Sequence, residues 1–423
     1  MWREMRVLGG KVDSTDIRAV LQATLLLWES PLFSAVLAFL AYLLVSLQFG
    51  PVGHASRFAY YNYLADAFLH GQLSLHLLPA QVHDLVLYHG NYYLYWPPFP
   101  AVLLAPFVAV FGVGFSDVLF TLALGSLDVG LVALLLRQAD RRGIISLSSL
   151  QRALLVLFFA LGTVMLTLAP YGRVWYTGQL VAFLCIALAY LAAISLRGWI
   201  AFLLTGLALA LAMLTRNHLV FAGVWPAWFL LKSHAGSGWK RQIALGLAGV
   251  GPIVIAVGMF AAYNWLRFGG IFNVGLDYHL MDPSFISDYR RFGAFNLHYL
   301  ATNLHYQYIF YPFPLSKQSY MGGSLFLLSP VFFAGITAIF TDRRRISNLV
   351  LLASILLVDI PILLLMGTGW VQFGPRYSLD FIVPLLILTA RGVKNWPDWL
   401  FGILTLISVA SYWIGTFFLM GSM

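Results

Sequence analysis

Two aspartates in an aromatic and histidine-rich stretch, residues 51–115, are the first candidates for chemistry in this sequence. In the segment RFAYYNYLADAFLH, a helix would place Asn62, Asp66 and His70 on one face, because they are four residues apart. Asp84 follows in HDLVLYHGNYYLYWPPFP. Partial desolvation at a water–lipid boundary tunes a carboxylate towards general-base chemistry. We therefore expect Asp66 or Asp84 to be catalytic and favour Asp66, with a solvated polar stripe as an equal alternative for this helix.

Three arginines form the second set of candidates. Arg173 lies in PYGRVWYTGQ, Arg216 in LTRNH and Arg376 in FGPRYSLD, each where an apolar run meets a polar segment. A planar guanidinium binds phosphate through paired donors, so arginines at one membrane level would suit a lipid phosphate. His218 and Tyr377 stand beside two of them and join the predicted substrate-binding set. For any single arginine, snorkelling at a helix end is the more ordinary explanation.

Other motifs narrow the chemistry by exclusion. The five histidines of residues 51–115 suggest metal ligation, but no pair has compact spacing such as HxxxH, so we predict no metal site and leave a divalent cation as a less favoured alternative. No Walker loop, dinucleotide fingerprint or serine-hydrolase elbow occurs. The formal charge of +9 is spread along the chain, which argues against a nucleic-acid partner.

The elements that must position these residues are apolar helices. Hydrophobic residues make up 61% of the chain and charged residues 10%, against about 25% charged in soluble domains. Apolar runs of about 17–25 residues recur, the length that spans a bilayer. The prediction is one all-α polytopic membrane domain, residues 1–423, with about 11 transmembrane helices. The expected spans are about 31–49, 116–137, 153–169, 179–196, 199–215, 218–231, 243–266, 323–340, 347–366, 378–390 and 398–420.

The distribution of positive charge orients these spans. Most of the 25 lysines and arginines fall in alternate connecting segments, as the positive-inside rule expects, so the N-terminus is predicted to be cytoplasmic. Residues 51–115 and 267–322 then become long extracytoplasmic loops. Residues 99–114 are short and interrupted by prolines, so we expect an interfacial or re-entrant helix there. The charges that place the N-terminus inside are Arg3, Arg6, Lys11 and Arg18.

Aspartates also lie within the predicted spans and in the second loop. Asp128 and Asp359 fall in the middle of predicted spans, where an acid is costly and often functional. In a transporter or flippase they would be coupling sites near the membrane midplane. The sequence shows no internal repeat, which argues against a transporter. Because no basic residue lies inside a predicted span to pair with them, we expect neutral, hydrogen-bonded carboxyls. Asp277, His279 and Asp282 form a loose cluster in residues 267–322, for which a binding and an interfacial role are weighted equally.

The order of these elements resembles the GT-C superfamily of membrane glycosyltransferases. A first span precedes a long outer loop with YNYLADAFLHG, and then GNYYLYWPPFPAVLLAP, in which Gly90, Tyr92, Tyr93, Pro97 and Pro98 match the family's pattern. The stretches GLALALAMLTRNH, YNWLRFG and FGPRYSLDFIVP are also similar to the family. The likeness is to bacterial relatives of protein O-mannosyltransferases and of lipid A aminoarabinose transferases.

The resemblance implies sugar transfer from a polyprenyl-phosphate donor to an acceptor hydroxyl, on the outer face of a prokaryotic cytoplasmic membrane. It implies membrane lipids as partners, usually inversion, and a loop carboxylate as base, and it leaves protein, lipid and glycan acceptors open. In the family an acidic residue, often Asp-Glu, follows the first span, whereas this sequence has HASR at residues 54–57. The base would then be displaced to Asp66 or Asp84. If it is absent, the chain would be a non-catalytic glycolipid-binding relative.

Overall fold

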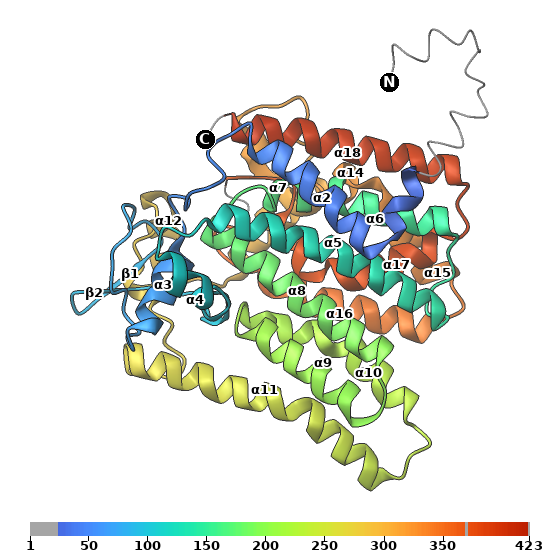
Figure 1. The fold of residues 1–423 in the computed structure, drawn as a ribbon, viewed down its shortest axis with the longest axis horizontal. Coiled ribbons are helices and arrows are strands. Elements are labelled where there is room, and N and C mark those ends of the chain that lie inside the picture. Colours follow the sequence, from blue (N-terminus) through green and yellow to red (C-terminus); the bar gives the residue numbers. More distant parts are fainter. Residues whose placement is uncertain (1–23, 369–370, 422–423) are drawn as a thin grey trace.

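The computed structural model describes residues 24–368 and 371–421. The predicted cytoplasmic segment, residues 1–19, lies outside the described residues and includes Arg3, Arg6, Lys11 and Arg18. Within the described part, long helices lie side by side along the longest axis of the molecule (Figure 1). The prediction of an all-α polytopic protein is confirmed.

Six helical segments in the described residues are long and apolar enough to cross a membrane. Local sequence sets their ends. The Ser116 side chain accepts a hydrogen bond from the backbone N–H of Leu119 at the start of α5, Ser148 and Gln151 form a capping box before α6, and Gly269 with φ 71° ends α11. The six are α5 (Asp117–Arg141), α6 (Ser149–Leu161) with α7 (Met165–Leu168), α8 (Val174–Ser195), α11 (Trp239–Phe268), α16 (Arg345–Leu363) and α18 (Asp398–Met420).

The other five predicted spans consist of shorter pieces. A 16-residue helix such as α2 is roughly 24 Å long, less than the hydrocarbon core of about 30 Å. Flanking turns and 3-10 segments must therefore complete these crossings. The pieces are α2 (Pro31–Ser46), α9 (Gly198–Met213), η2 (Asn217–Gly223) with α10 (Val224–Ser233), α14 (Leu325–Leu328) with η7 (Pro330–Phe332) and α15 (Phe333–Thr341), and η8 (Arg376–Phe381) with α17 (Ile382–Val393).

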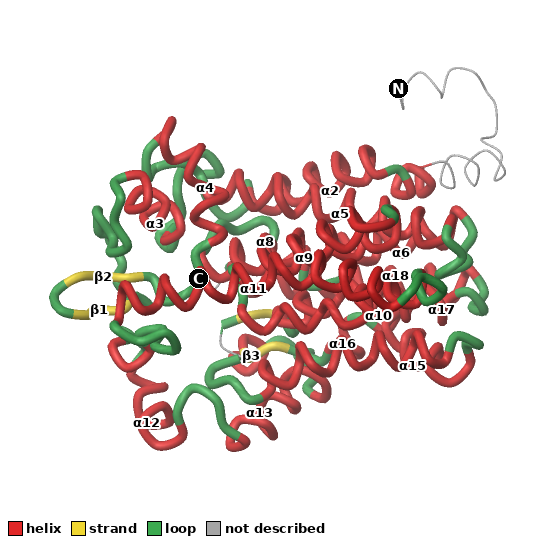
Figure 2. Tube along the Cα trace, turned by 90° about the horizontal axis from the view of Figure 1, so that it is seen from below, coloured by secondary structure: helices red, strands yellow, loops and turns green. Residues whose placement is uncertain are grey.

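Two long loops gather at one end of the helices, which we call the loop end (residues 47–116 and 269–324; Figures 1 and 2). The segment α2 ends there and α5 begins there, so the helix within residues 99–114 does not cross the bundle, as predicted. The loop end contains α3 (Tyr60–Leu69), a hairpin of β1 (Val86–Tyr88) and β2 (Asn91–Tyr93), α4 (Phe99–Phe111), η3 (Leu276–Tyr278), α12 (Pro283–Phe292), η4 (Leu297–Tyr299), α13 (Leu300–Leu304), η5 (His305–Ile309), η6 (Lys317–Tyr320) and β3 (Met321–Gly322), which pairs with β4 (Gln372–Phe373).

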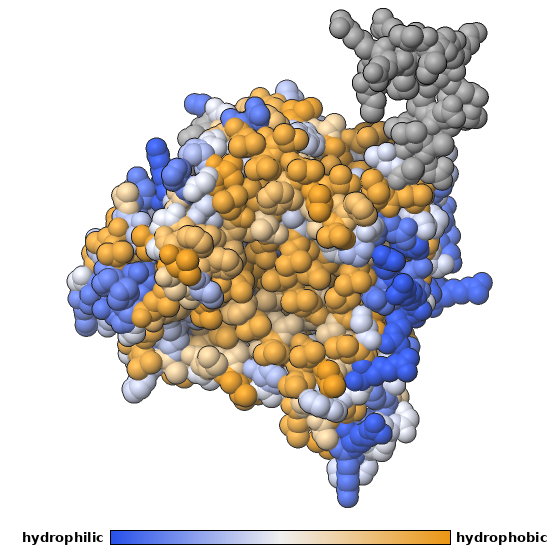
Figure 3. All heavy atoms as spheres, in the orientation of Figure 1, coloured by the Kyte–Doolittle hydropathy of each residue, from blue (hydrophilic) through white to orange (hydrophobic). Residues whose placement is uncertain are grey.

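The opposite end, which we call the basic end, is formed where α5, α10 and α17 finish and where α9, α11 and α16 begin. Its arginines join these connections: Arg142 donates to the backbone oxygen of Ser195 over 3.1 Å, and Arg344 donates to that of Gly143 over 2.9 Å. A broad apolar band lies between the two polar ends (Figure 3). This pattern is typical of a multi-pass membrane protein.

Small residues let helices of the band approach closely. A Cβ added at Gly206 of α9 would lie 1.9 Å from the backbone oxygen of Gly249 in α11. Much of α11 is nevertheless exposed, with 17% of its apolar window buried. At the end of the helix, a hydrogen bond runs from Arg267 Nη1 to the backbone oxygen of Leu94 over 2.6 Å. It fixes the end of α11, and the loop that follows, against the first loop.

Candidate active site

The buried carboxylate of Asp380, on η8, contacts two basic side chains from the segment that follows α9. Arg216 donates from Nε to Asp380 Oδ2 over 3.0 Å, and His218 Nε2 lies 3.0 Å from the same oxygen. Only 1% of Asp380 is exposed. A carboxylate at such a depth is costly unless it is paired, so these contacts fix the turn after α9 against η8.

Arg376, at the start of η8, is almost buried but has an unmatched charge. Its NH2 donates to the Tyr377 hydroxyl over 3.1 Å, and its NH1 donates to the side-chain oxygen of Gln179 on α8 over 3.4 Å. Within the described residues, Arg376 has no carboxylate at ion-pair distance, and its Nε has no hydrogen-bond partner. The guanidinium of Arg216 lies 4.9 Å from the centre of the Tyr377 ring, which Arg376 also contacts at 4.4 Å. The arrangement therefore has an excess positive charge that a phosphate group would balance.

Asp84 lies in the loop before β1, where three side chains converge on its carboxylate. Trp175 Nε1, on α8, donates to Oδ2 over 3.1 Å. On the other side, His279 Nε2 lies 3.1 Å from Oδ1 and His83 Nε2 lies 3.5 Å from it. The second loop delivers His279, because the backbone N–H of Asp84 donates to the oxygen of Leu280 over 3.0 Å. The carboxylate is thus positioned by α8 and by both loops.

Tyr95 connects this carboxylate to the arginines. Its ring packs edge-on against that of His279, with 4.7 Å between the ring centres, and its hydroxyl lies within electrostatic reach of Asp84 and Arg376. Burial, together with the negative charge of Asp84, raises the pKa of Tyr95 well above its usual value, so the hydroxyl stays a neutral donor. We call this group the inner cluster: Asp84, His279, Tyr95, Arg216, His218, Arg376, Tyr377 and Asp380.

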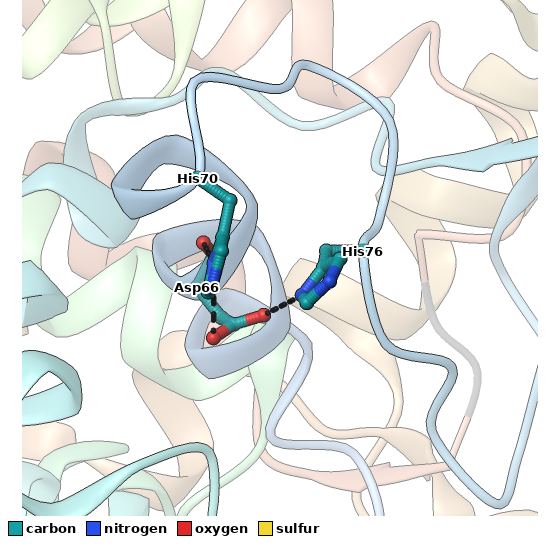
Figure 4. Close-up of side chains that lie close together, drawn as sticks. All are labelled: Asp66, His70 and His76. Carbon is teal, nitrogen blue, oxygen red and sulfur yellow. Dashed lines mark hydrogen bonds and ion pairs between the residues drawn. The ribbon is translucent and has the colours of Figure 1, made fainter.

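Asp66 belongs to a different group, on the surface of the loop end. Its Oδ2 lies 3.0 Å from His76 Nδ1, and its Oδ1 lies 3.6 Å from His70 Nδ1 (Figure 4). We call Asp66, His70 and His76 the outer cluster. Within the described residues, no ion pair joins Asp66 to an arginine. The described contacts therefore connect Asp84, and not Asp66, to the predicted phosphate-binding residues.

Arg173 lies beside the inner cluster, at the residue that precedes α8. Its guanidinium lies 5.8 Å from the centre of the Phe58 ring and 5.9 Å from that of Tyr176. Phe58 in turn packs on Trp175, with 5.0 Å between the ring centres. Arg173 thus flanks Trp175, the residue that holds Asp84.

The segment that follows α2 has no acidic residue of its own at residues 54–57, but an aspartate of α5, Asp117, contacts it. The backbone N–H and the hydroxyl of Ser56 each donate to a different oxygen of Asp117 over 2.7 Å. Asp117 is 2% exposed, and a Cβ at Gly172 would lie 2.5 Å from its Cγ. Because both oxygens are occupied and the site is closed, Asp117 anchors the start of the first loop.

The two acids predicted inside spans differ from each other. Asp359 on α16 accepts hydrogen bonds from Gln307 over 2.6 Å and from Tyr308 over 2.5 Å, so the prediction of a hydrogen-bonded carboxyl is confirmed there. It is wrong for Asp128 on α5, which is fully buried and whose oxygens have no hydrogen-bond partner among the described residues. Neither acid contacts the inner cluster through a described hydrogen bond.

A cavity of about 310 Å³ lies at the basic end and is lined by Arg142, Arg197 and His234, among others. None of the predicted site residues lines it. This hollow is therefore separate from the inner cluster.

Three members of the site were missed by the sequence prediction. Asp380 lies within the predicted span 378–390, so the argument applied there to Asp128 should have singled it out as well. His279 was seen only in a loose group with Asp277 and Asp282. Of these, Asp277 accepts from the Tyr289 hydroxyl and Asp282 caps α12. Nothing in the sequence marks Tyr95, because its role depends on contacts between distant segments.

No protein-family model matches the sequence, and no curated protein matches it. Among solved structures, the chain is similar to ArnT from Cupriavidus metallidurans bound to undecaprenyl phosphate. The TM-score is 0.51 at 17% identity, over 86% of this chain and 60% of ArnT. The fold is that of a GT-C glycosyltransferase. The predicted fold class is thereby confirmed.

Two further GT-C structures are similar at lower scores. The oligosaccharyltransferase of Archaeoglobus fulgidus gives a TM-score of 0.49 at 13% identity, over 93% of this chain and 55% of that one. The O-mannosyltransferase complex Pmt1-Pmt2 of S. cerevisiae, bound to its sugar donor, gives 0.37 at 16% identity, over 64% and 36%. The present chain spans about 60% of the length of ArnT.

Proposed function

We propose that the chain is a membrane glycosyltransferase that moves a sugar from a polyprenyl-phosphate donor to an acceptor hydroxyl. The observation that supports this is the inner cluster, in which Asp84 with His279 and Arg376 with Tyr377 are all close enough to Tyr95 to act on it, through ring packing or through charge. The first pair supplies a base and the second an unmatched positive charge. ArnT, which has the same fold, was solved with undecaprenyl phosphate, an anionic lipid of the class that this charge would suit.

In the proposed reaction, Asp84 removes the proton of the acceptor hydroxyl while its oxygen attacks the anomeric carbon of the sugar. The bond from that carbon to the phosphate oxygen breaks, and its electron pair leaves with the polyprenyl phosphate. Negative charge grows on the phosphate, where Arg376 and the Tyr377 hydroxyl donate to it. Arg216 is held by Asp380, and its guanidinium packs on the Tyr377 ring. Attack opposite the leaving group inverts the anomeric configuration.

Charge distribution supports an orientation for this reaction. Arginines and lysines concentrate in the connections at the basic end. The positive-inside rule would put this end in the cytoplasm. The loop end then faces outwards, and residues 51–115 and 267–322 form extracytoplasmic loops of a single membrane domain. A prokaryotic cytoplasmic membrane is the location that fits a polyprenyl-phosphate donor.

The test is transfer from a radiolabelled polyprenyl-phosphate sugar by the purified full chain in detergent or liposomes. Asp84→Asn should lower kcat by about 10²–10⁴-fold, the usual contribution of a general base. The matched control is Asp66→Asn, which removes a carboxylate from the same loop outside the inner cluster and should retain transfer. Undiminished transfer by Asp84→Asn would show that another group is the base.

The alternatives give different outcomes in the same experiment. A non-catalytic glycolipid-binding relative would bind the lipid-linked sugar, and Arg376→Gln would weaken that binding. Neither the wild type nor any variant would transfer the sugar. A transporter or flippase would move the lipid across liposomes, and Asp128→Asn would abolish that flux.

A further inference from the structure

The outer cluster has the composition and spacing of a metal site. Asp66 and His70 stand one turn apart at the end of α3, and His76 lies on the loop that follows. One ligand atom from each, two imidazole nitrogens and one carboxylate oxygen, lies within 4.8 Å of the other two. All three side chains point towards the same small region, as Figure 4 shows. A set of two histidines and one aspartate is typical of zinc and similar divalent transition metals.

The separations between each histidine nitrogen and its nearer Asp66 oxygen are close to those between ligands of a tetrahedral ion. Zinc binds nitrogen at about 2.0–2.1 Å and carboxylate oxygen at about 2.0–2.2 Å, so adjacent tetrahedral ligands lie roughly 3.3–3.5 Å apart. The measured separations are 3.0 Å from Asp66 Oδ2 to His76 Nδ1 and 3.6 Å from Oδ1 to His70 Nδ1. Both nitrogens lie beside the one carboxylate, and the two imidazole rings are stacked with 4.1 Å between their centres. The rings would turn from this stacked arrangement to direct both nitrogens at one ion.

We propose that Asp66, His70 and His76 bind one divalent transition metal ion of the zinc class, through His70 Nδ1, His76 Nδ1 and a carboxylate oxygen of Asp66. The side chains of His70 and His76 are 51% and 38% exposed, so a water molecule takes the fourth position. His70 Nδ1 also lies 2.9 Å from the backbone oxygen of Asp66, an arrangement that suits a proton on Nδ1. Metal binding through Nδ1 would require each ring to carry its proton on Nε2, and His70 would then give up this hydrogen bond.

The ion would fasten the first loop to α3. The chain continues from His76 to Asp84. Leu75, which precedes His76, donates from its backbone N–H to the backbone oxygen of Tyr92 in β2 over 2.8 Å. At the start of the same helix, the Tyr60 hydroxyl donates to the backbone oxygen of His83 over 2.7 Å. The metal would thus hold the C-terminal end of α3 as Tyr60 holds its beginning. This role is structural and does not depend on the proposed transferase reaction.

The test is metal binding by the purified full chain. After removal of bound metal with a chelator and dialysis, the protein is titrated with ZnCl₂ and, separately, with MgCl₂. We expect one zinc ion per chain by elemental analysis, an upward shift of the thermal unfolding midpoint with zinc, and no shift with magnesium, which prefers an all-oxygen shell. His76→Ala and Asp66→Asn should weaken zinc binding by at least about 10–100-fold, the loss seen when even an indirect metal contact is removed.

The matched control is His54→Ala, which removes an exposed histidine of the same loop from outside the cluster and should bind zinc like the wild type. Three results would each overturn the proposal: the wild type binds no zinc, His76→Ala binds zinc as well as the wild type does, or His54→Ala loses binding as much as His76→Ala does. All the substituted side chains are at the surface or beside it, so the variants should fold. Because the readouts are stoichiometry and thermal stability, failure of this proposal is distinct from failure of transfer.

Discussion

The inner and outer clusters are two carboxylate centres of the same loop end, and they differ in what surrounds them. The inner cluster takes side chains from both loops, from the segment that follows α9 and from η8, and places Asp84 and Asp380 among histidines, arginines and tyrosines. The outer cluster takes all three of its side chains from residues 66–76 and lies at the surface. The inner cluster is therefore a product of tertiary structure, whereas the outer cluster is local.

The difference assigns different chemistry to similar residues. An aspartate beside an unmatched guanidinium can act on a substrate whose phosphate that guanidinium holds. An aspartate beside two exposed histidines can ligate a metal, but no group near it is placed to stabilise a leaving phosphate. Both clusters contain the same kind of carboxylate, so the side chains around each aspartate determine the chemistry that it can perform.

The largest expected difference concerns stability. Asp380→Ala leaves the guanidinium of Arg216 without its buried carboxylate, and breaking a buried pair from one side costs about 3–5 kcal/mol. Asp66→Ala, in protein without metal, removes only contacts to exposed histidines and should cost less than about 1 kcal/mol. Denaturant unfolding in mixed micelles measures both. Equal costs would remove the distinction between a buried and a surface centre.

The second prediction separates the two arginines within the inner cluster. Arg376→Gln leaves no carboxylate without a partner, so stability should change little. The loss of charged hydrogen bonds to the donor phosphate, about 1.5–3 kcal/mol, should lower kcat/KM by roughly 10–100-fold. Arg216→Gln should instead destabilise the chain as Asp380→Ala does, because Asp380 stays buried and loses its main partner. Transfer kinetics and unfolding of the two variants test this. A change in stability alone for Arg376→Gln would make it a structural residue.

The sequence could predict the outer cluster's elements better than the inner cluster's contacts. Helical spacing gave the face shared by Asp66 and His70, and the run of apolar segments gave the fold class, since both depend on neighbours along the chain. The preference for Asp66 over Asp84 followed from the same local pattern. Asp84 obtains Trp175 and His279 from segments far away in the sequence, and spacing carries no information about such contacts.

The same limit explains the metal prediction. A search for two histidines at helical spacing does not detect the outer cluster, in which an aspartate four residues before His70 takes the place of one histidine and a loop residue adds the third side chain. The positions of Arg216 and Arg376 at span boundaries were readable from charge and hydropathy. Asp380 pairs with Arg216 and not with Arg376. This difference depends on how η2 and η8 pack, which charge and hydropathy along the sequence do not show.

A smaller effect should come from the histidine that accompanies each carboxylate. His279→Gln removes the imidazole beside Asp84 while the backbone pairing of Leu280 with Leu85, 2.8 Å from N to O, keeps the loop in place. We expect kcat to fall about tenfold, or about 1.4 kcal/mol, with KM within about twofold, because the imidazole positions the base and does not touch the donor. His70→Gln should leave both constants unchanged. A rise in KM without a fall in kcat for His279→Gln would contradict this role.

The smallest effect on transfer should come from removing the metal. If the ion only fastens α3 to the first loop, a chelator should lower the thermal unfolding midpoint by a few degrees while kcat at 25 °C changes by less than about twofold. His76→Ala should reproduce this result without a chelator, and the chelator should then have no further effect. Rates and midpoints measured on one preparation decide the matter. A chelator that abolished transfer by the wild type but spared His76→Ala would mean that the metal involved is bound elsewhere. Abolition in both the chelated wild type and His76→Ala would instead make the outer cluster part of the reaction.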